Sequence, residues 1–444
     1  MNTPICDFVK QYRQRKAVRL HMPGHKGTKI LGAEPFDITE IDGADVLYHA
    51  NGIIRESEQN ASVLFGTQKT LYSTEGSSLC IRAILLLIKQ LAESRGEHPL
   101  VLAGRNAHKT FLSASAMLHI DIEWLFSADD NLLSCCLDYT QCEKILREKK
   151  VTALYITSPD YLGNIANIEK LSTLCKKYGT ILAVDNAHGA YLKFLCPSLH
   201  PIDLGADICC DSAHKTLPVL TGGAYLHIAK HAPALLAKEA ENALSLFAST
   251  SPSYLILQSL DFANRLLSEA LPQKINDMAK QTAVLKKRLS DKGFSFVGNE
   301  PLKLTLSAKP YGYLGTALAK TLETQNIVCE FSDPDFLVLM LSSETSKKDL
   351  TTLEQALSEL PKKPPLAYTS LRMARPLILM PYDKAMFAVS ERTAIDKAEG
   401  KILASPTVSC PPAVPILVSG EQIHADAIKC FQYYGIEYCL TVKE

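Results

Sequence analysis

The sequence lacks a charge excess, a long apolar run and a CxxC pair. Lysine plus arginine and aspartate plus glutamate each total 47, so the formal net charge is zero. A general nucleic-acid binder or a protein that binds anionic membranes would carry a basic excess. The longest apolar run, residues 83–88, is too short to cross a membrane. We therefore expect a soluble protein with no nucleic-acid or membrane partner.

The thirteen cysteines lack the spacing of a disulfide framework or a metal site. Their number is odd, and residues 135–136 and 209–210 are adjacent pairs, which suit neither disulfides nor zinc. We expect buried, reduced thiols in a cytoplasmic protein, and we expect no metal.

Between about residues 70 and 230, short apolar runs alternate with helical stretches. The runs that predict strands are residues 100–103, 151–157, 181–184, 206–210 and 224–228. They are apolar throughout, which is typical of strands that are buried on both faces of a sheet. The pattern predicts an α/β fold with a mostly parallel sheet, and ligands bind such sheets at the carboxyl ends of the strands.

The pattern changes after about residue 250, first to long helices and then to a smaller α+β unit. KKPP at residues 362–365 predicts a linker. The domains that we predict are an N-terminal helical segment at 1–20, a large α/β domain at 21–260, a small α+β domain at 261–361 and a C-terminal segment at 366–444.

Polar residues follow the predicted strands at the ligand edge of the sheet. STEGSS opens a long apolar helix, and the hydroxyls of Ser77 and Ser78 could hold a phosphate there or merely cap the helix. His108 could stack on a flat ring or shuttle protons, or simply be exposed. Asp185 could be a metal ligand, a base, the partner of a cationic ring nitrogen, or a loop cap.

Lys215 lies about 30 residues after Asp185, past the end of the next strand, in DSAHKTLP. A lysine amine in a partly buried cleft can lose its proton and attack a carbonyl, and Ser212 adds another hydroxyl. An anion site, a ring stacker, an acid for a pyridinium and a nucleophilic lysine together indicate one cofactor, pyridoxal phosphate (PLP).

Several motifs carry a family resemblance over most of the chain. They are RLHMPGHKG, DITEIDGADVL, STEGSS, GRNAHKT, DNAHGAY, DSAHKTLP, STSPSYLILQSLD and, more loosely, GKILASPTVSCPPAVPILVSGE. With these motifs the chain resembles the ornithine/lysine/arginine decarboxylase family, whose members are fold-type I PLP enzymes with the aspartate-aminotransferase architecture.

The resemblance implies roles for the residues that would bind the cofactor. Lys215 would form the Schiff base, Asp185 would pair with the pyridine nitrogen, and His108 would stack on the ring. The residues implied to bind the phosphate are Ser77, Ser78 and Ser212.

Four further residues take roles from the same resemblance. His214 lies beside the Schiff base, where it would help proton transfer, and His188 lies near the cofactor with its role open. Thr250 and Ser251 resemble a segment that reaches the phosphate of the neighbouring subunit. The resemblance therefore implies a homodimer with active sites shared across the interface.

Three positions depart from the pattern of the family. Asn186 stands where the family usually has glutamate, CPPAVP at residues 410–415 replaces a YPPGIP-type segment, and Ser419 replaces a proline. Because these positions lie toward the substrate entrance in relatives, they bear on the substrate more than on the cofactor. The match begins by residue 19, so we expect no N-terminal wing domain, and a dimer or small oligomer.

The expected reaction is PLP-dependent decarboxylation of arginine, lysine or ornithine to the amine and carbon dioxide. An aminotransferase or carbon–carbon lyase would share every cofactor residue, with Arg372 or Arg375 as a carboxylate clamp. A non-catalytic PLP-binding protein is a third hypothesis. Asp333, Asp335 and Glu421 are candidate partners for a cationic substrate side chain.

Overall fold

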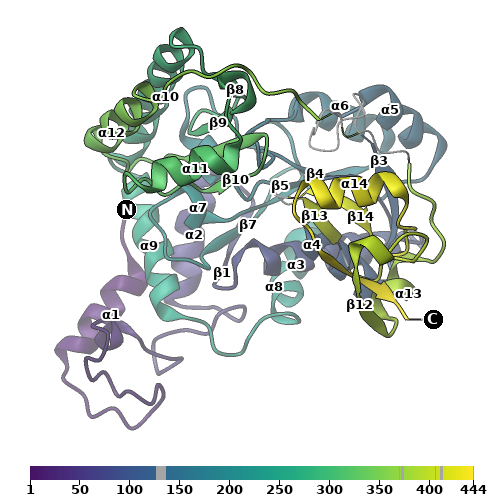
Figure 1. Ribbon diagram of the computed structural model, residues 1–444. Helices are drawn as coiled ribbons and strands as arrows, with labels where there is room; N and C mark the ends of the chain where they lie inside the picture. Colours follow the sequence, from purple (N-terminus) through teal and green to yellow (C-terminus); the bar gives the residue numbers. More distant parts are fainter. Residues whose placement is uncertain (127–136, 370, 372–374, 406, 411–413, 444) are drawn as a thin grey trace. The chain divides into compact units, whose positions relative to one another are not determined.

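The computed structural model describes residues 1–126, 137–369, 371, 375–405, 407–410 and 414–443 (Figure 1). Cys135, Cys136, Arg372 and residues 411–413 of the CPPAVP segment lie outside this range. The chain divides into two compact units that interleave along the sequence. The first unit is Met1–Pro99, Thr152–Leu154 and Ile168–Asn276, and the second is Leu100–Val151, Tyr155–Asn167 and Asp277–Glu444.

The first unit contains the STEGSS and DSAHKTLP motifs. Its helices are α1 (Pro4–Gln14), η1 (Glu34–Phe36), α2 (Ile53–Phe65), α3 (Gly76–Ser94), α6 (Ile168–Tyr178), η2 (Ala190–Phe194), α7 (Ala213–Thr216), α8 (Ala234–Ser245) and α9 (Tyr254–Leu267). Its strands are β1 (Lys69–Ser73), β5 (Ile181–Asp185), β6 (Ile208–Asp211) and β7 (Ala224–Ile228). Two elements have residues in both units, β4 (Ala153–Thr157) and α10 (Leu271–Asp291).

The remaining elements belong to the second unit. Its helices are α4 (Lys109–Leu118), α5 (Tyr139–Glu148), η3 (Lys309–Tyr311), α11 (Gly315–Glu323), α12 (Lys347–Ser358), α13 (Tyr382–Phe387), η4 (Ile395–Lys397) and α14 (Ala425–Tyr433). Its strands are β2 (Leu100–Gly104), β3 (Asp121–Leu125), β8 (Ser295–Val297), β9 (Lys303–Ser307), β10 (Phe331–Ser332), β11 (Phe336–Met340), β12 (Ser390–Ala394), β13 (Thr407–Cys410), β14 (Val414–Val418) and β15 (Tyr438–Val442).

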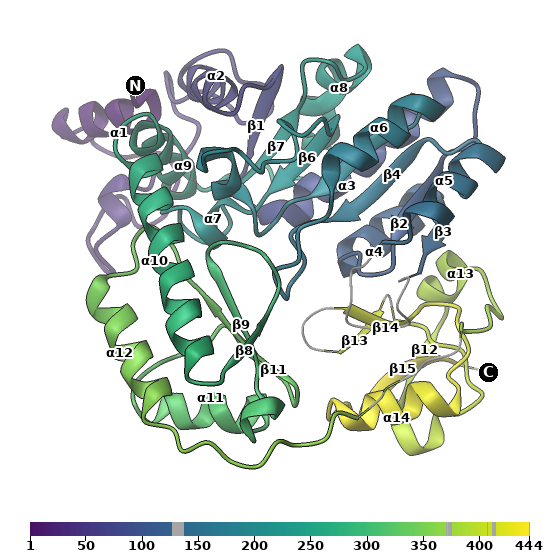
Figure 2. The same cartoon turned by 90° about the horizontal axis from the view of Figure 1, so that it is seen from above.

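The main sheet has seven strands in the order β1-β7-β6-β5-β4-β2-β3. Strands β5 and β6 are parallel, as are β2 and β3, whereas β7 runs antiparallel to both of its neighbours, β6 and β1. The α/β fold and its mostly parallel sheet are therefore confirmed, with one antiparallel strand, β7, next to the edge strand β1. Helix α3 packs across β1, β6 and β7 (Figure 2).

A fully buried polar cluster lies on one face of this sheet in the first unit. The Asp211 carboxylate accepts hydrogen bonds from Asn186 Nδ2 (2.7 Å), His200 Nε2 (3.0 Å) and His227 Nε2 (3.2 Å). All four side chains are completely or almost completely excluded from solvent. We call this set of four residues the Asp211 network.

His200 and His227 determine the protonation state of the buried Asp211 carboxylate. Burial alone would raise the pKa of Asp211, but the His200 and His227 rings offset burial and hold that pKa below its usual range. Burial also lowers the pKa of His227, although Asp211 partly opposes this effect. The folded state therefore favours an ionised Asp211 beside a neutral His227 ring.

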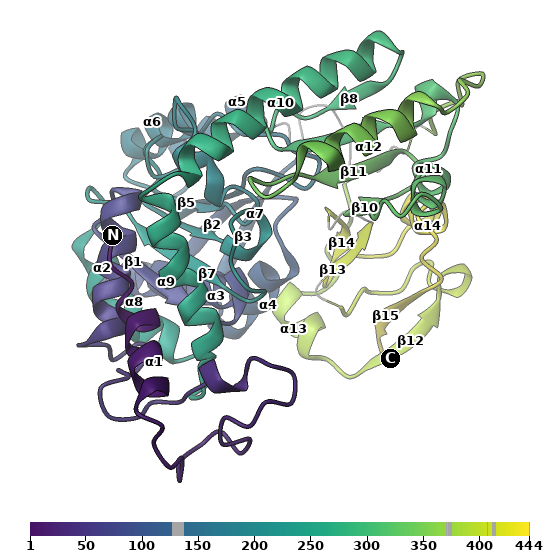
Figure 3. The same cartoon turned by 90° about the vertical axis from the view of Figure 1, so that its left-hand side faces the viewer.

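A second buried network joins α1, α2, β1 and α9. Asp261 on α9 accepts hydrogen bonds from Ser57 Oγ (2.6 Å) and from the backbone N–H of Cys6 (3.0 Å). Asn264, one turn later, donates to the Tyr72 hydroxyl at 2.7 Å. These bonds, together with the packing of α1 on α2 and α9 (Figure 3), fix the N-terminal helix to the first unit.

The second unit contains a smaller sheet with strand order β10-β11-β9-β8. Helices α10 and α12 lie side by side, linked by an Arg288–Glu354 ion pair of 3.3 Å (Figures 1 and 3). The C-terminal elements from α13 to β15 gather around a core that includes Ile416, Leu417 and Phe431 (Figure 2). Within the part of the chain that is described, no helix has the length and apolarity needed to span a membrane.

The Asp211 network makes the stability of the protein sensitive to acid. Because the pKa of folded His227 lies below its unfolded value, the unfolded chain binds more protons, and stability falls as the pH drops below about 6.5. Asp211 acts in the same direction at lower pH, since its stabilisation is lost as the pH falls through its depressed pKa. We expect His227 to lower the unfolding free energy of the cofactor-free protein between about pH 7.5 and about pH 5.5, measured as the difference between urea titrations of the unmodified protein and of a variant without this ring.

His227→Gln should remove the contribution of this proton, which is at most about 1.4 kcal/mol per pH unit. His49→Gln, at an exposed position, is the control and should leave the slope unchanged. An unchanged slope in His227→Gln would contradict the assignment.

Candidate active site

Helix α3 begins with a backbone contact to the loop that follows Lys215. The N–H of Gly76 donates to the carbonyl oxygen of Gly222 at 2.7 Å. Ser77 lies at the first turn of this 19-residue helix, and its Oγ accepts a hydrogen bond from Ser212 Oγ at 2.8 Å. A Cβ added at Gly76 would meet nothing within 4 Å, so the space before the helix is open. Two hydroxyls from different elements and the start of a long helix therefore meet at one open point.

Asp185 is the last residue of β5 and is almost completely buried. Its Oδ1 accepts a hydrogen bond from the N–H of Ala187 at 3.2 Å and lies 3.8 Å from the thiol of Cys210, its neighbour across the strand pair. A protonated ring nitrogen has the charge that suits a buried carboxylate. The geometry thus suits the role that the sequence predicts for Asp185.

Lys215 lies on the short helix α7, directly after β6. Its Nζ is 3.0 Å from Nε2 of His188, which is almost completely buried, while Lys215 itself is exposed. A proton can pass directly between groups at this distance. The structure therefore brings together two residues that the sequence left unconnected.

His214, next to Lys215, is oriented by the same glycine loop. Its Nδ1 lies 3.0 Å from the carbonyl oxygen of Gly223. Because a carbonyl oxygen only accepts, Nδ1 must carry the proton, and Nε2 of the neutral ring is then a base.

Two glycines near the lysine are required by close packing. Gly222 has φ +99°, and an added Cβ would lie 2.8 Å from the carbonyl oxygen of Thr74. A Cβ at Gly189 would overlap the side chain of Asn186. Gly189 was not predicted to belong to the site, and Asn186 was noted only as a departure that bears on the substrate. The three-residue spacing in DNAHG carries no signal of this contact.

Thr250 and Ser251 are exposed in the segment between α8 and α9. The adjacent Ser249 donates its backbone N–H to Glu75 Oε1 at 2.8 Å, and Ser251 donates its own to Ser249 Oγ at 3.1 Å. Glu75 is the residue before α3. The segment is therefore held at the start of α3. Its reach to a neighbouring subunit stays a prediction.

Ser78 follows Ser77 in the first turn of α3 and is partly buried. His108 belongs to the second unit, where it caps α4: its Nδ1 accepts a hydrogen bond from the N–H of Thr110 at 3.2 Å. This bond places the proton of the neutral ring on Nε2. The predicted roles of Ser78 and His108 stay predictions.

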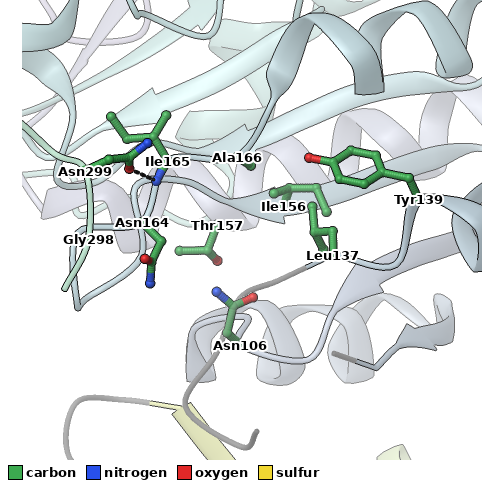
Figure 4. A pocket seen from close by; sticks show the side chains of 10 residues that line it. All are labelled: Asn106, Leu137, Tyr139, Ile156, Thr157, Asn164, Ile165, Ala166, Gly298 and Asn299. Atoms are coloured by element: carbon green, nitrogen blue, oxygen red, sulfur yellow. Dashed lines mark hydrogen bonds between the residues drawn. The ribbon is translucent and has the colours of Figure 1, made fainter. Parts of the chain in front are cut away.

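The second unit has a cavity of about 390 Å³ (Figure 4). One of its lining residues, Asn106, lies two positions before His108 in the sequence. It is lined by Asn106, Leu137, Tyr139, Ile156, Thr157, Asn164, Ile165, Ala166, Gly298 and Asn299. The amide side chains of Asn106 and Asn164 and the hydroxyl of Thr157 lie around its centre (Figure 4). No lining side chain carries a charge, so the cavity offers no counter-charge to a basic amino acid.

The candidate partners for a cationic substrate are already engaged within the second unit. Asp335 pairs with Lys309 at 2.7 Å, and Glu421 pairs with Arg105 at 2.6 Å. Asp333 is 1% exposed, and burial raises its pKa to about 6. None of these three carboxylates is a free anion at the surface.

The rival carboxylate clamp and the altered C-terminal segment lie in the same unit. Arg375 is exposed, with its guanidinium carbon 4.8 Å from the centre of the Phe126 ring. Ser419 is buried and donates a hydrogen bond to the carbonyl oxygen of Ala404 at 3.2 Å. Ser419 therefore stabilises the fold of the C-terminal segment.

The residues of the first unit fit PLP. A dianionic phosphate matches the two hydroxyls and the open helix start, and a pyridinium matches the buried Asp185. A carbonyl matches the exposed amine of Lys215. These residues thus offer hydroxyls, a carboxylate and an amine, which suit the phosphate, the ring nitrogen and the carbonyl of the cofactor.

Comparison with known proteins agrees with this geometry. The family described as Orn/Lys/Arg decarboxylase, major domain, matches residues 3–301, and the C-terminal domain of the same family matches residues 375–437. An uncharacterised protein of Bacillus subtilis (strain 168), YaaO, is 27% identical over 458 residues, which cover 97% of this chain and 93% of YaaO. An arginine decarboxylase of the same organism is 27% identical over 462 residues, covering 96% of this chain and 92% of its own.

Solved structures show the same fold. The lysine decarboxylase LdcF of Francisella novicida superposes with a TM-score of 0.80 at 16% identity, covering 99% of this chain and 81% of its own. An SPT protein solved with PLP gives a TM-score of 0.56 at 14% identity, covering 71% of this chain and 79% of its own. The fold is that of the fold-type I PLP enzymes, and the chain belongs to the Orn/Lys/Arg decarboxylase family.

Proposed function

We propose that the protein is a PLP-dependent decarboxylase that converts arginine, lysine or ornithine into the corresponding amine and carbon dioxide. The observation that carries the proposal is the 3.0 Å contact between Lys215 Nζ and His188 Nε2, in the same unit as the Ser77–Ser212 hydroxyl pair. The curated arginine decarboxylases similar to this chain favour a basic amino acid as substrate.

When bound, PLP would supply an electron sink for the electrons left by departing carbon dioxide. Lys215 would hold the cofactor covalently through its amine until the substrate amine replaces it. Asp185 would pair with the ring nitrogen through its buried carboxylate and so favour the protonated form of that nitrogen. Ser77, Ser78 and Ser212 would bind the phosphate.

His188 would exchange a proton with the Lys215 amine, so that the amine is uncharged when it acts as a nucleophile. His214, with Nδ1 fixed by Gly223, presents Nε2 as a second base. We further propose that His108 stacks on the cofactor ring, and that Thr250 and Ser251 serve a homodimer with shared sites.

Lys215→Ala tests the covalent attachment. We expect the visible absorbance band of the bound cofactor to disappear and turnover to fall by a factor of at least about 10³, because the amine that would attach the cofactor is removed. Lys238→Ala, at an exposed lysine on α8, is the matched control and should keep both the band and the rate. Retention of the band and of full turnover in Lys215→Ala would show the assignment to be wrong.

The reaction type is tested by incubating the purified protein and PLP with arginine, lysine and ornithine in turn. Decarboxylation predicts stoichiometric carbon dioxide and amine from at least one of them. Keto acid without carbon dioxide would show an aminotransferase instead. Cofactor binding without any product from a wide panel of amino acids would support a non-catalytic protein.

His188→Ala tests the proton exchange with Lys215. We expect a loss of about 10²- to 10⁴-fold in kcat, together with a changed pH–rate profile, because the titrating imidazole is gone. His231→Ala is the control, since His231 is partly exposed and pairs with Asp207 at 3.6 Å. A pH–rate profile identical to that of the unmodified protein would remove His188 from the proton transfer.

A further inference from the structure

We propose that the Asp211 network is a positioning device, which holds the ends of β5 and β6 at the distance and rotation that the cofactor residues need. Asn186 and Asp211 are its positioning residues. The inference rests on the proposed function for the identity of the cofactor, but the contacts that carry it lie wholly within the first unit.

Two pairs of consecutive residues lie at the ends of neighbouring strands. Asp185 is the last residue of β5 and Asn186 follows it, while Asp211 is the last residue of β6 and Ser212 follows it. Successive side chains of a strand point to opposite faces of the sheet. Asp185 accordingly lies with Cys210 on one face, while Asn186 reaches Asp211 on the other. Asn186 and Asp211 are thus direct chain neighbours of Asp185 and Ser212, two of the residues proposed to bind the cofactor.

The backbone and the side chains lock the same junction. The N–H of Asn186 donates to the carbonyl oxygen of Cys210 at 2.9 Å, one residue beyond the last strand pair, Asp185 and Cys210. The side-chain bond from Asn186 to Asp211 then adds a second constraint 2.7 Å long. A twist of either strand end would break both bonds and would move Asp185 relative to Ser212.

The Asp211 network also contacts further elements of the first unit through His227. His227 on β7 is the cross-strand partner of Cys209 on β6, and its Nδ1 lies 2.9 Å from Thr70 Oγ1 on β1. Phe65 on α2 packs against the His227 ring, with centroids 4.3 Å apart. The carboxylate of Asp211 is therefore held by three donors whose own positions are fixed by other elements.

A purely structural purpose does not require this chemistry. Buried polar networks can often be replaced by apolar residues of similar volume without loss of stability. The directional bonds of a carboxylate, in contrast, fix angles that apolar packing leaves free. The network is placed where angles matter, directly beside Asp185 and Ser212.

A metal site is the alternative that the same residues raise. His200, Cys209 and Asp211 place one ligand atom each within 4.8 Å of one another. However, Nδ1 of His200 accepts from the N–H of Ile202 at 3.4 Å, so the proton of the neutral ring lies on Nε2, which faces Asp211. That nitrogen donates a hydrogen bond and has no lone pair for a metal.

The test uses a set of variants at the junction. Asn186→Asp sets two carboxylates against each other. The double variant Asn186→Asp/Asp211→Asn restores every bond, because the new amide at position 211 accepts from both histidines through its oxygen and donates through its nitrogen to position 186. Asp261→Ala removes a buried carboxylate from the other network of the same unit and is the matched control.

The first readout is the dissociation constant of PLP for the folded protein. We expect Asn186→Asp to raise it about tenfold or more, and the double variant to return it to within about threefold of the unmodified value. Asp261→Ala should lower the melting temperature and leave this constant unchanged. If Asn186→Asp yields no soluble protein, Asn186→Ala, which only removes the donor, serves the same comparison.

The second readout is hydrogen exchange in the protein without cofactor. Residues 185–188 and 211–215 should exchange faster in Asn186→Asp than in Asp261→Ala, beyond any general loss of stability. A purely structural network predicts lower melting temperatures with unchanged PLP affinity and no local increase in exchange, and this result would overturn the proposal. A stoichiometric metal in the purified protein would overturn it as well.

The two hypotheses fail in different ways. If the unmodified protein binds no PLP, the proposed function falls, while hydrogen exchange still decides whether the network positions the strand ends. If the unmodified protein binds PLP and Asn186→Asp binds it equally well, only the positioning role falls.

Discussion

The buried carboxylate of Asp211 is the constraint on which the geometry of this site depends. A charge without solvent is tolerated only when its lone pairs are satisfied, and here one asparagine and two histidines satisfy them. The directions of those bonds leave little freedom to the end of β6. Ser212 and Lys215 follow that end directly, so their positions are set by a group that is sealed off from the reaction.

The two faces of the sheet divide the work between them. One face carries Asp185 and leads to Lys215, while the other carries the hydrogen bonds from Asn186, His200 and His227 to Asp211. Gly189 makes this division possible, because any side chain there would occupy the space of Asn186. The DNAHGAY motif thus contributes to both faces, with Asp185 and His188 in the proposed chemistry and Asn186 and Gly189 in the contacts behind it.

The parts of the site that the sequence revealed are those whose signal is local. Apolar runs located β2, β5 and β7, and the residues that follow such runs included Asp185 and Lys215. The contact between Lys215 and His188 was not predictable, because it depends on how the loops after β5 and β6 turn. Strand order was equally hidden, so the antiparallel pairing of β1 with β7 could not be derived.

The Asp211 network was missed for a related reason. Its members come from β6, β7 and the loops after β5 and η2, and no spacing in the sequence relates them. A weak signal did exist, since His227 interrupts an otherwise apolar strand and a polar residue in a buried strand needs a partner. The identity of that partner requires the register of β6 against β7, in which His227 lies opposite Cys209.

The interleaving of the two units has a consequence for how the chain is made. Strand β1 ends at Ser73, but it pairs with β7, which ends at Ile228, and α1 packs on α9, which follows later still. During synthesis the first hundred residues therefore emerge before the rest of their own unit. Part of the second unit is made between these two parts of the first. Long-range pairing of this kind slows folding and leaves apolar strands unpaired for longer. The nascent chain accordingly passes through a period in which protection from aggregation matters most, and that period ends only when residues near 276 have left the ribosome.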